Sequence, residues 1–179
     1  MTGTPKLSTM PLWPCARVAG PILDGTFRVD FDYTKQTFNG GPVVNPPPNN
    51  SIQWAFRSIC PSAGCVATGA ALSDGNNQKV AVGATDVLRF TDGHWQDTPY
   101  LRPPAQCTGP PSGAITDTVT SSWSFEPQPD GTLQGVQIVT TVTNECGGTK
   151  GTVRRTPISA TRIGDVPPSV TLADPALFK

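Results

Sequence analysis

Alternating hydrophobic and polar residues recur along this chain and predict short β-strands. In residues 25–33, Phe27, Val29 and Phe31 occupy every second position, and polar or charged residues stand between them. A period of two is typical of a strand that buries one face. Residues 118–127 repeat the pattern less strictly.

Turn signals separate further strand-like runs. Tight turns are predicted at Asn39-Gly40, Asp92-Gly93 and Pro129-Asp130-Gly131. The other strand-like runs lie at residues 51–60, 65–72, 78–96, 132–143 and 152–163. No segment keeps a helical period for more than a turn or two. Roughly eight to ten short strands, spaced by about 8–12 residues, predict an all-β fold, either an antiparallel sandwich or a distorted barrel with little helix.

Proline-rich segments suggest the domain limits. We expect residues 1–22 to be a linker or arm, residues 23–165 to form a single β domain, and residues 166–179 to be a Pro-rich tail. Residues 99–113 hold five prolines and read as a long crossing loop. Pro157 lies within the last strand-like run, which suggests an edge position or a bulge.

Composition narrows the class of protein. The 179 residues carry no net charge, and 15% of them are charged. Nucleic-acid binders carry a basic excess, so that class is disfavoured, and no run of Lys and Arg suggests an electrostatic membrane patch. No apolar run approaches the roughly 18 residues of a membrane span. The first 15 residues lack the apolar core of a signal peptide, which by itself suggests a cytosolic protein. The cysteines argue otherwise, so we expect a segment of a longer protein.

Five cysteines bear on the compartment: Cys15, Cys60, Cys65, Cys107 and Cys146. Zinc sites favour close pairs such as C-x2-C, and redox motifs need C-x-x-C at the start of a helix. The C-x4-C spacing of Cys60 and Cys65 fits neither. Strand-like runs flank this pair, with Pro61 and Gly64 between, so a disulfide across a hairpin is the better interpretation.

A second bridge between Cys107 and Cys146 would close a loop of about 40 residues. Cys15 is then left over. It could be free, could pair with another chain, or could replace one partner in this scheme, because sequence alone does not determine connectivity. Two disulfides imply an oxidising, extracytoplasmic location.

Motifs for catalysis are scarce. The sequence has no nucleotide-binding loop and no G-x-S-x-G elbow. His94, the single histidine, could act as a base with Asp92 or Asp97, but a polar residue leaving a tight turn is the more ordinary role. Asp30 and Asp32 share one strand face and resemble a carboxylate pair, but the solvated face of that strand is their more ordinary role. We predict no catalytic, metal or cofactor site.

Other polar and aromatic residues have a binding interpretation and a simpler one. The aromatic residues could line a groove, but they more often fill a β core; they are Trp54, Phe56, Trp95, Trp123 and Phe125. Three arginines could bind an anion or a partner carboxylate: Arg154, Arg155 and Arg162. Arg154 and Arg155 are adjacent in a strand and point to opposite faces, so they do not form one patch. Asn49-Asn50-Ser51 matches a glycosylation acceptor, which chance also explains.

Four stretches together resemble a known family: DGTFRVDFDYTKQTFNG, WAFRSICPSAGCVATGAAL, VTSSWSFEPQPDGTLQGVQIVTTVTNECG and RIGDVPPSVTLADP. They are similar to the extracytoplasmic sensor domains that follow the membrane helix of some mycobacterial serine/threonine protein kinases. The resemblance spans roughly residues 20–175 and is most specific at W-A-F-R-S-x-C-x4-C-V-A-T. Cys60, Cys65, Cys107 and Cys146 match the family's cysteine positions, and Cys15 lies outside that pattern.

The resemblance implies a non-catalytic, receptor-like module outside the plasma membrane, tethered through residues 1–22 to a membrane helix and a kinase domain. It implies no cofactor. Expected partners are a second copy of the domain, which would raise the effective concentration of linked kinases, and an unidentified envelope ligand. A free-standing secreted or lipid-anchored envelope binding protein is the alternative, and a hydrolase built on His94 is a further one.

Overall fold

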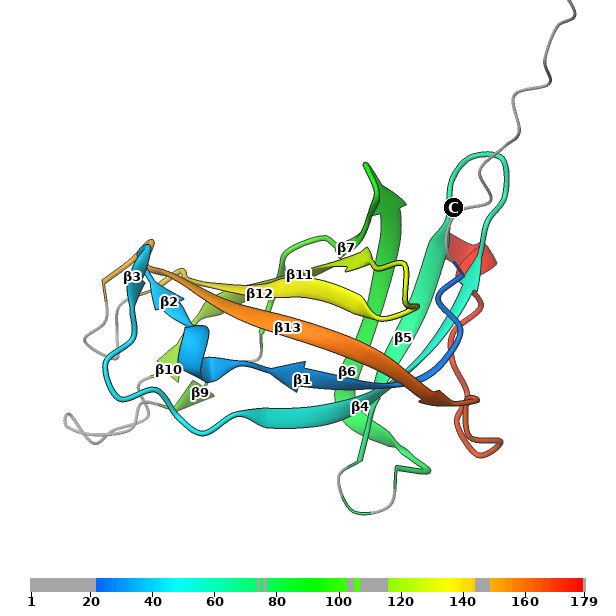
Figure 1. The fold of residues 1–179 in the computed structure, drawn as a ribbon, viewed down its shortest axis with the longest axis horizontal. Coiled ribbons are helices and arrows are strands. Elements are labelled where there is room, and N and C mark those ends of the chain that lie inside the picture. Colours follow the sequence, from blue (N-terminus) through cyan, green and yellow to red (C-terminus); the bar gives the residue numbers. More distant parts are fainter. Residues whose placement is uncertain are drawn as a thin grey trace, which may run out of the picture.

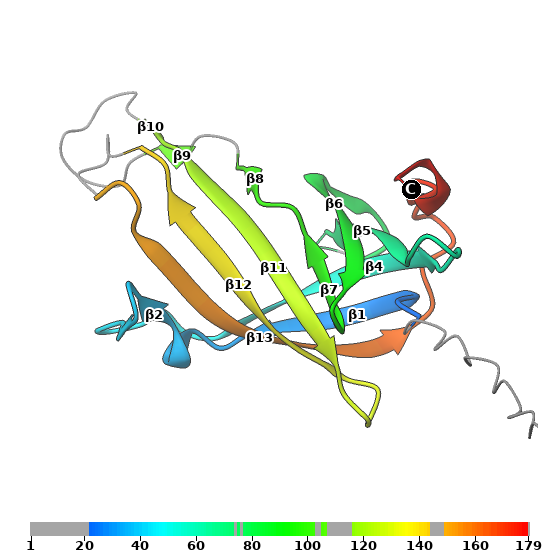
Figure 2. The ribbon, with the colours of Figure 1, turned by 90° about the horizontal axis from the view of Figure 1, so that it is seen from above.

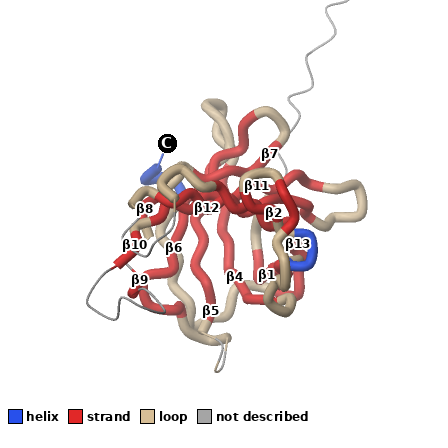
Figure 3. The backbone as a smooth tube through the Cα atoms, turned by 90° about the vertical axis from the view of Figure 1, so that its left-hand side faces the viewer, coloured by secondary structure: helices blue, strands red, loops and turns tan. Residues whose placement is uncertain are grey.

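Eight antiparallel strands close into a barrel (Figures 1 and 3). The computed structural model describes residues 22–73, 75, 77–102, 105–106, 116–143 and 149–178. In spatial order the barrel strands are β1 (Gly25–Phe31), β4 (Asn50–Ile59), β5 (Val66–Leu72), β6 (Val80–Thr91), β7 (His94–Asp97), β11 (Val119–Pro127), β12 (Leu133–Thr141) and β13 (Val153–Gly164). Pairing of β13 with β1 closes the ring, with Val29 opposite Ala160. The all-β prediction is confirmed, and of the two predicted architectures, sandwich and barrel, the structure has the barrel.

Shorter elements decorate the barrel. They are the 3-10 helix η1 (Tyr33–Lys35), the strands β2 (Thr37–Phe38), β3 (Gly41–Pro42), β8 (Tyr100–Leu101), β9 (Ala105–Gln106) and β10 (Thr116–Asp117), and the 3-10 helix η2 (Pro175–Phe178). The β2–β3 hairpin extends the sheet from β13, β8 pairs with β11, and β9 and β10 form a separate two-stranded sheet.

Aromatic side chains fill the interior of the barrel. Trp95 and Phe125 are fully buried, and Trp54, Phe56 and Trp123 are at least 95% buried. The rings of Trp54 and Trp123 meet edge to face with centroids 4.6 Å apart, a favoured aromatic geometry. The interpretation of these five residues as core is confirmed.

The tight turns follow from local sequence. Asp92 and Gly93 have φ values of 52° and 84° and join β6 to β7 in a two-residue hairpin in which Thr91 faces His94. Positive φ at both turn positions suits the twist of a hairpin and favours Asp-Gly. At the β11–β12 turn, the Asp130 carboxylate accepts hydrogen bonds from the Thr132 backbone N–H and hydroxyl. The turns at Asp92-Gly93 and Asp130-Gly131 are therefore confirmed.

Pro157 does not mark an edge strand, since β13 pairs with β12 on one side and with β1 and β2 on the other. The Asp32 N–H donates to the Pro157 carbonyl from the β1 side, at the point where β1 has ended and β2 has not begun. The missing N–H of the proline therefore faces the junction between two partner strands, where the ladder needs no donor.

The stretch from residue 166 to residue 178 lies against β4 and β5 (Figure 2), although the sequence suggested a Pro-rich tail for residues 166–179. Val170 packs with Ala55 and Leu72, and the Thr68 hydroxyl donates to the Ala173 carbonyl at 2.7 Å. Every residue of β5 is buried as a result, because the barrel interior covers one face and this segment covers the other.

Candidate functional site

A groove of about 840 Å³ opens beside the β2–β3 hairpin, at the end of β1 where η1 begins. We call it the hairpin groove. Its wall includes Tyr33, Phe38, Val43, Val44, Pro47 and Arg154. It therefore combines aromatic and aliphatic side chains with one guanidinium group.

Local sequence positions the hairpin. Asn39 and Gly40 have φ values of 49° and 84°, so they form a two-residue turn in which Phe38 faces Gly41. Asn39 also ties the turn to β13, because its side-chain oxygen accepts a hydrogen bond from the Val153 N–H at 2.8 Å. Buried Gln36 donates from Nε2 to the Thr156 hydroxyl at 2.6 Å and anchors the start of β2 to β13.

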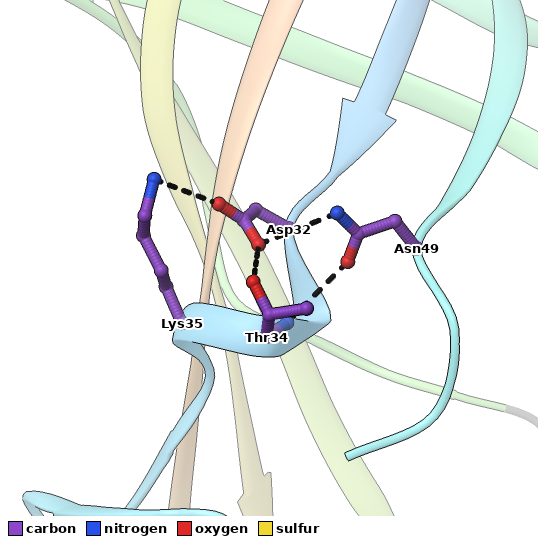
Figure 4. Close-up of polar contacts among 4 residues, drawn as sticks. All are labelled: Asp32, Thr34, Lys35 and Asn49. Carbon is purple, nitrogen blue, oxygen red and sulfur yellow. Dashed lines mark hydrogen bonds and ion pairs between the residues drawn. The ribbon is translucent and has the colours of Figure 1, made fainter.

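A polar cluster around Asp32 fixes the other side of the groove (Figure 4). One carboxylate oxygen of Asp32 accepts hydrogen bonds from the Thr34 hydroxyl at 2.5 Å and the Asn49 amide at 3.4 Å, and the other lies 3.0 Å from Lys35 Nζ. The Asn49 side-chain oxygen accepts from the Thr34 N–H at 3.3 Å. The Thr34 hydrogen bond first, and then Lys35, lower the pKa of Asp32 to about 2.

Two large apolar side chains of this groove are open to solvent. Phe38 is 45% exposed and Val44 is 83% exposed, although each lies on a segment held by the hydrogen bonds just described. In the described part of the chain, the exposed Arg154 side chain has no hydrogen-bond or ion-pair partner. A held, partly apolar surface of this kind is suited to contact with a partner rather than to chemistry.

The predicted Cys60–Cys65 disulfide is present and spans the end of the β4–β5 hairpin. Ile59 pairs with Val66 directly before it, and the Gly64 N–H donates to the Pro61 carbonyl inside the loop. The bridge therefore holds a turn, as the flanking strands indicated. Cys15, Cys107 and Cys146 lie outside the described residues.

His94 does not meet Asp97. Trp95 is fully buried, and Asp97 shares its face of β7, whereas His94 is on the opposite face. His94 Nδ1 lies 2.9 Å from the Asp92 carbonyl oxygen, and its Nε2 lies 3.8 Å from Glu126. Its contacts are those of a polar residue leaving a turn.

The remaining candidates are separated from one another. Asp30 pairs with Arg28 at 3.1 Å, whereas Asp32 joins the cluster of Thr34, Lys35 and Asn49, so the two aspartates do not act as a carboxylate pair. Arg162 lies at the far end of β13, where it donates to the Asp24 carbonyl and pairs with Asp165.

Arg154 and Arg155 are both exposed near the hairpin groove, opposite Phe38 and Thr37 of β2. The Asn49-Asn50-Ser51 tripeptide enters β4, and its Asn49 amide is engaged by Asp32 and Thr34. Only Arg154 and Asn49 of these candidates line the groove itself, together with Asn50.

No group of three or more His, Cys, Asp or Glu residues within the described ranges could hold a metal ion. Over the same ranges, neither of the two short helices comes near the length and apolar character of a membrane span.

Sequence reasoning missed one polar feature inside the barrel. Asp86 and Asp97 both face the interior at one end, in line with buried Leu88 and buried Trp95. The alternating pattern could have revealed it, since each aspartate stands at a position of its strand where the alternation places inward-facing, mostly apolar residues.

Comparison with known proteins identifies the family. The chain matches the family model of the PknI serine/threonine-protein kinase sensor domain over residues 20–177. The chain belongs to this family. The resemblance to kinase sensor domains is confirmed, and the chain corresponds to the sensor part of PknI-type kinases.

Curated relatives named serine/threonine-protein kinase PknI, from Mycobacterium tuberculosis and Mycobacterium bovis, are 36% identical to this chain over 174 residues. The match covers 94% of this chain and 29% of each relative. This PknI-type sensor domain therefore spans less than a third of the length of the relatives it matches.

Two solved structures share the fold. A monomer form of the M. tuberculosis PknI sensor domain matches with a TM-score of 0.69 and 31% identity, covering 89% of this chain and 99% of that one. A dimer form matches with a TM-score of 0.61 and 30% identity, covering 98% and 99%. The PknI sensor domain of M. tuberculosis thus has both a monomer and a dimer form.

Proposed function

We propose that this domain is the extracytoplasmic sensor of a membrane-bound serine/threonine protein kinase and that it promotes kinase activation by self-association. Membership of the PknI sensor family, with a relative solved as both monomer and dimer, is the observation that carries the proposal. Reversible association of two domains would raise the effective concentration of the attached kinases and favour phosphorylation in trans. A ligand would act by preferring one of the two forms.

The hairpin groove is the surface that we assign to association. The closed barrel leaves β13 without a free edge, so pairing through the strand that bears Pro157 is not available. Among the described strands, β3 in contrast pairs with β2 alone, and the exposed side chains of Phe38 in β2 and of Val44, just after β3, lie beside it. Covering these side chains removes apolar area from water, and Arg154, which has no ion-pair partner among the described residues, offers a partner carboxylate a counter-charge.

The groove and the described ends of the chain lie at opposite ends of β1. Near the start of β1, Arg162 donates to the Asp24 carbonyl and the Thr26 hydroxyl donates to the Asp165 carbonyl, so chain entry and the departure from β13 meet there. We expect residues 1–22 to form the juxtamembrane tether at that end. The proposed association surface would then face away from the tether.

Sedimentation velocity over a concentration series tests the association step. We expect a concentration-dependent shift from monomer to dimer. A single monomer species up to several hundred micromolar contradicts the proposal.

The upstream reading frame tests the attached kinase. A frame that continues into a membrane helix and kinase motifs supports the proposal, whereas one that begins with a secretion or lipidation signal supports a free-standing envelope binding protein.

We also infer an oxidised domain with a second bridge between Cys107 and Cys146 and with Cys15 unpaired. The family pattern of cysteines and the Cys60–Cys65 bridge support this inference. Peptide mapping without reductant should yield one free thiol per chain, at Cys15, unless that cysteine links two chains. Free thiols at Cys107 and Cys146 in air-exposed protein would overturn it.

A further inference from the structure

Two aspartates on neighbouring strands, Asp86 and Asp97, point into the interior at one end of the barrel. Leu88 of β6 pairs with Asp97 of β7, and Asp86 lies two residues before Leu88, so both carboxyl groups are on the interior face as diagonal neighbours. On the other side of Asp86, its partner in β5 is Gly69, which has no side chain to separate the carboxyl group from the interior.

Trp123 of β11 holds both carboxyl groups. Its indole N–H donates to Asp86 Oδ2 at 2.6 Å, and its backbone N–H donates to Asp97 Oδ1 at 2.8 Å. The other oxygen of Asp86 accepts from the Val87 N–H at 2.7 Å. Three of the four carboxyl oxygens therefore have an N–H donor, and these contacts join β6, β7 and β11.

The fourth oxygen, Asp97 Oδ2, is buried and receives no hydrogen bond from any donor within the described residues. Leaving an ionised carboxylate oxygen buried without a donor is costly. A proton on one carboxyl group removes that cost, because a protonated carboxyl can donate to the other, and the two groups lie close enough to hydrogen-bond.

The surrounding groups do not neutralise the pair. Across the described residues, neither carboxyl group takes part in an ion pair. Tyr100 of β8 interacts electrostatically with both carboxyl groups and with Arg102, whose guanidinium donates to the Ser121 hydroxyl of β11. Arg89 lines the same pocket as Asp86 but donates to the Phe178 carbonyl of η2.

The residues of other packed elements that line the pocket beside Asp86 carry no charge. β5 contributes Thr68 and Gly69, and the C-terminal stretch contributes Thr171 and Ala173. Two negative charges at this place would repel each other in a poorly solvated environment.

We propose that Asp86 and Asp97 share one proton and act as a pH-responsive latch that fastens β6, β7 and β11 together at this end of the barrel. With the proton in place, all four oxygens are satisfied and the three strands are joined through Trp123. Loss of the proton leaves two carboxylates in contact and weakens that junction. The latch is a property of this barrel alone and does not depend on self-association or on an attached kinase.

The direction of the pH effect follows from burial. Burial raises the pKa of both carboxyl groups, and for Asp97 the neighbouring Asp86 adds to the rise, which brings its pKa to about 8. Above pH 3.8, the ordinary pKa of an aspartate, the unfolded chain releases a proton that the folded protein still holds. The contribution of the latch is thus complete below about pH 4 and is lost as the pH rises towards 8.

Protons can reach the pair from outside. Asp86 lines a pocket of about 450 Å³ together with Tyr100, Thr171, Ala173 and Phe178. The C-terminal stretch that packs on β5 forms part of the wall of this pocket. Asp86 and that stretch therefore border the same opening. A looser latch is therefore expected to loosen this cover as well.

Urea unfolding from about pH 4 to pH 9 tests the latch. Because folding takes up one proton in this window, the unfolding equilibrium constant of the wild type should rise by up to about tenfold per pH unit. Asp97→Asn should at least halve that slope, since the amide that replaces the carboxyl group can accept from the Trp123 N–H and donate to Asp86 without ionising. The control Asp30→Asn removes an outward-facing carboxylate of β1 and should keep the wild-type slope. Equal slopes for Asp97→Asn and wild type overturn the proposal.

A direct titration decides the matter even if Asp97→Asn does not fold. Carboxyl-carbon NMR of aspartate-labelled wild-type domain should show two coupled carboxyl groups, one with a midpoint near pH 8. If every aspartate of the folded domain titrates below about pH 5, as ordinary exposed carboxyl groups do, the latch does not exist.

Discussion

The ring of Phe56 on β4 lies over Gly69, its cross-strand partner on β5, so closely that a Cβ atom at position 69 would come within 2.5 Å of the ring. Glycine is therefore required here by packing and not by backbone conformation. The arrangement lets an aromatic residue of the core fill the place that a side chain of β5 would otherwise take.

Gly69→Ala is predicted to lower the free energy of unfolding by about 1–3 kcal/mol, because the added methyl group must displace Phe56 in a close-packed interior. Urea unfolding measures the loss. Gly164→Ala is the matched control, since nothing lies within 4 Å of its added Cβ, and we expect a change within about 0.5 kcal/mol. Equal effects of the two substitutions would show that the Phe56 contact does not matter.

Local features of this fold could be predicted from sequence because they depend on neighbouring residues. Asp92-Gly93 forms a two-residue turn through its positive φ values, and Cys60 meets Cys65 because the strands before and after them pair. Closure of the barrel could not be predicted, since sandwiches and barrels both bury one face of each strand. The β1–β13 contact that decides between them joins distant segments.

The polar parts of the structure were harder to predict for a different reason. Asp86 lies on the same inward face of β6 as buried Leu88. Aspartate is so seldom buried without an ion-pair partner, however, that sequence alone suggests a solvent-exposed residue. The hairpin groove depends on Asp32 meeting Asn49, which are brought together only by the return of the chain into β4. The cover of β5 by Val170 likewise arises from packing of a Pro-rich stretch that has no periodic pattern.

The Asp32 cluster should make the domain sensitive to strong acid. The pKa of Asp32 is lowered to about 2 from 3.8, so the stabilising contribution of its ionised carboxylate is present above about pH 4 and is lost as the pH falls through 2. Urea midpoints between pH 4 and pH 2 should therefore fall more steeply for wild type than for Asp32→Asn. Thr34→Val removes the strongest donor to Asp32 and should give an intermediate slope. Parallel slopes for all three proteins would exclude this role.

The Cys60–Cys65 bridge should have a local and limited effect. Replacing both cysteines by serine is predicted to lower the free energy of unfolding by about 2 kcal/mol or less, because the loop that the bridge closes is short. The barrel should remain folded, as the pairing of β4 with β5 continues for six residue pairs beside the bridge. Circular dichroism and urea unfolding measure both points. An unfolded double variant would contradict this view of the bridge as a clamp on one turn.

The hairpin groove should govern self-association. Phe38→Ser combined with Val44→Ser is expected to raise the dimer dissociation constant at least about tenfold, because both side chains are exposed in the monomer and covered in the proposed dimer. Val82→Ser, which removes a fully exposed apolar side chain from β6, is the control and should leave the constant unchanged. Sedimentation velocity separates the two outcomes. An unchanged constant for the double variant would place the dimer surface elsewhere.

The central claim is that association of this domain activates an attached kinase, and domain replacement in the full-length protein tests it most directly. Autophosphorylation is measured in membranes after exchanging this domain for an unrelated extracytoplasmic domain that is either strictly monomeric or constitutively dimeric. We predict that the monomeric replacement lowers phosphate incorporation and that the dimeric one restores or exceeds the original level. Equal incorporation with both replacements would contradict the account.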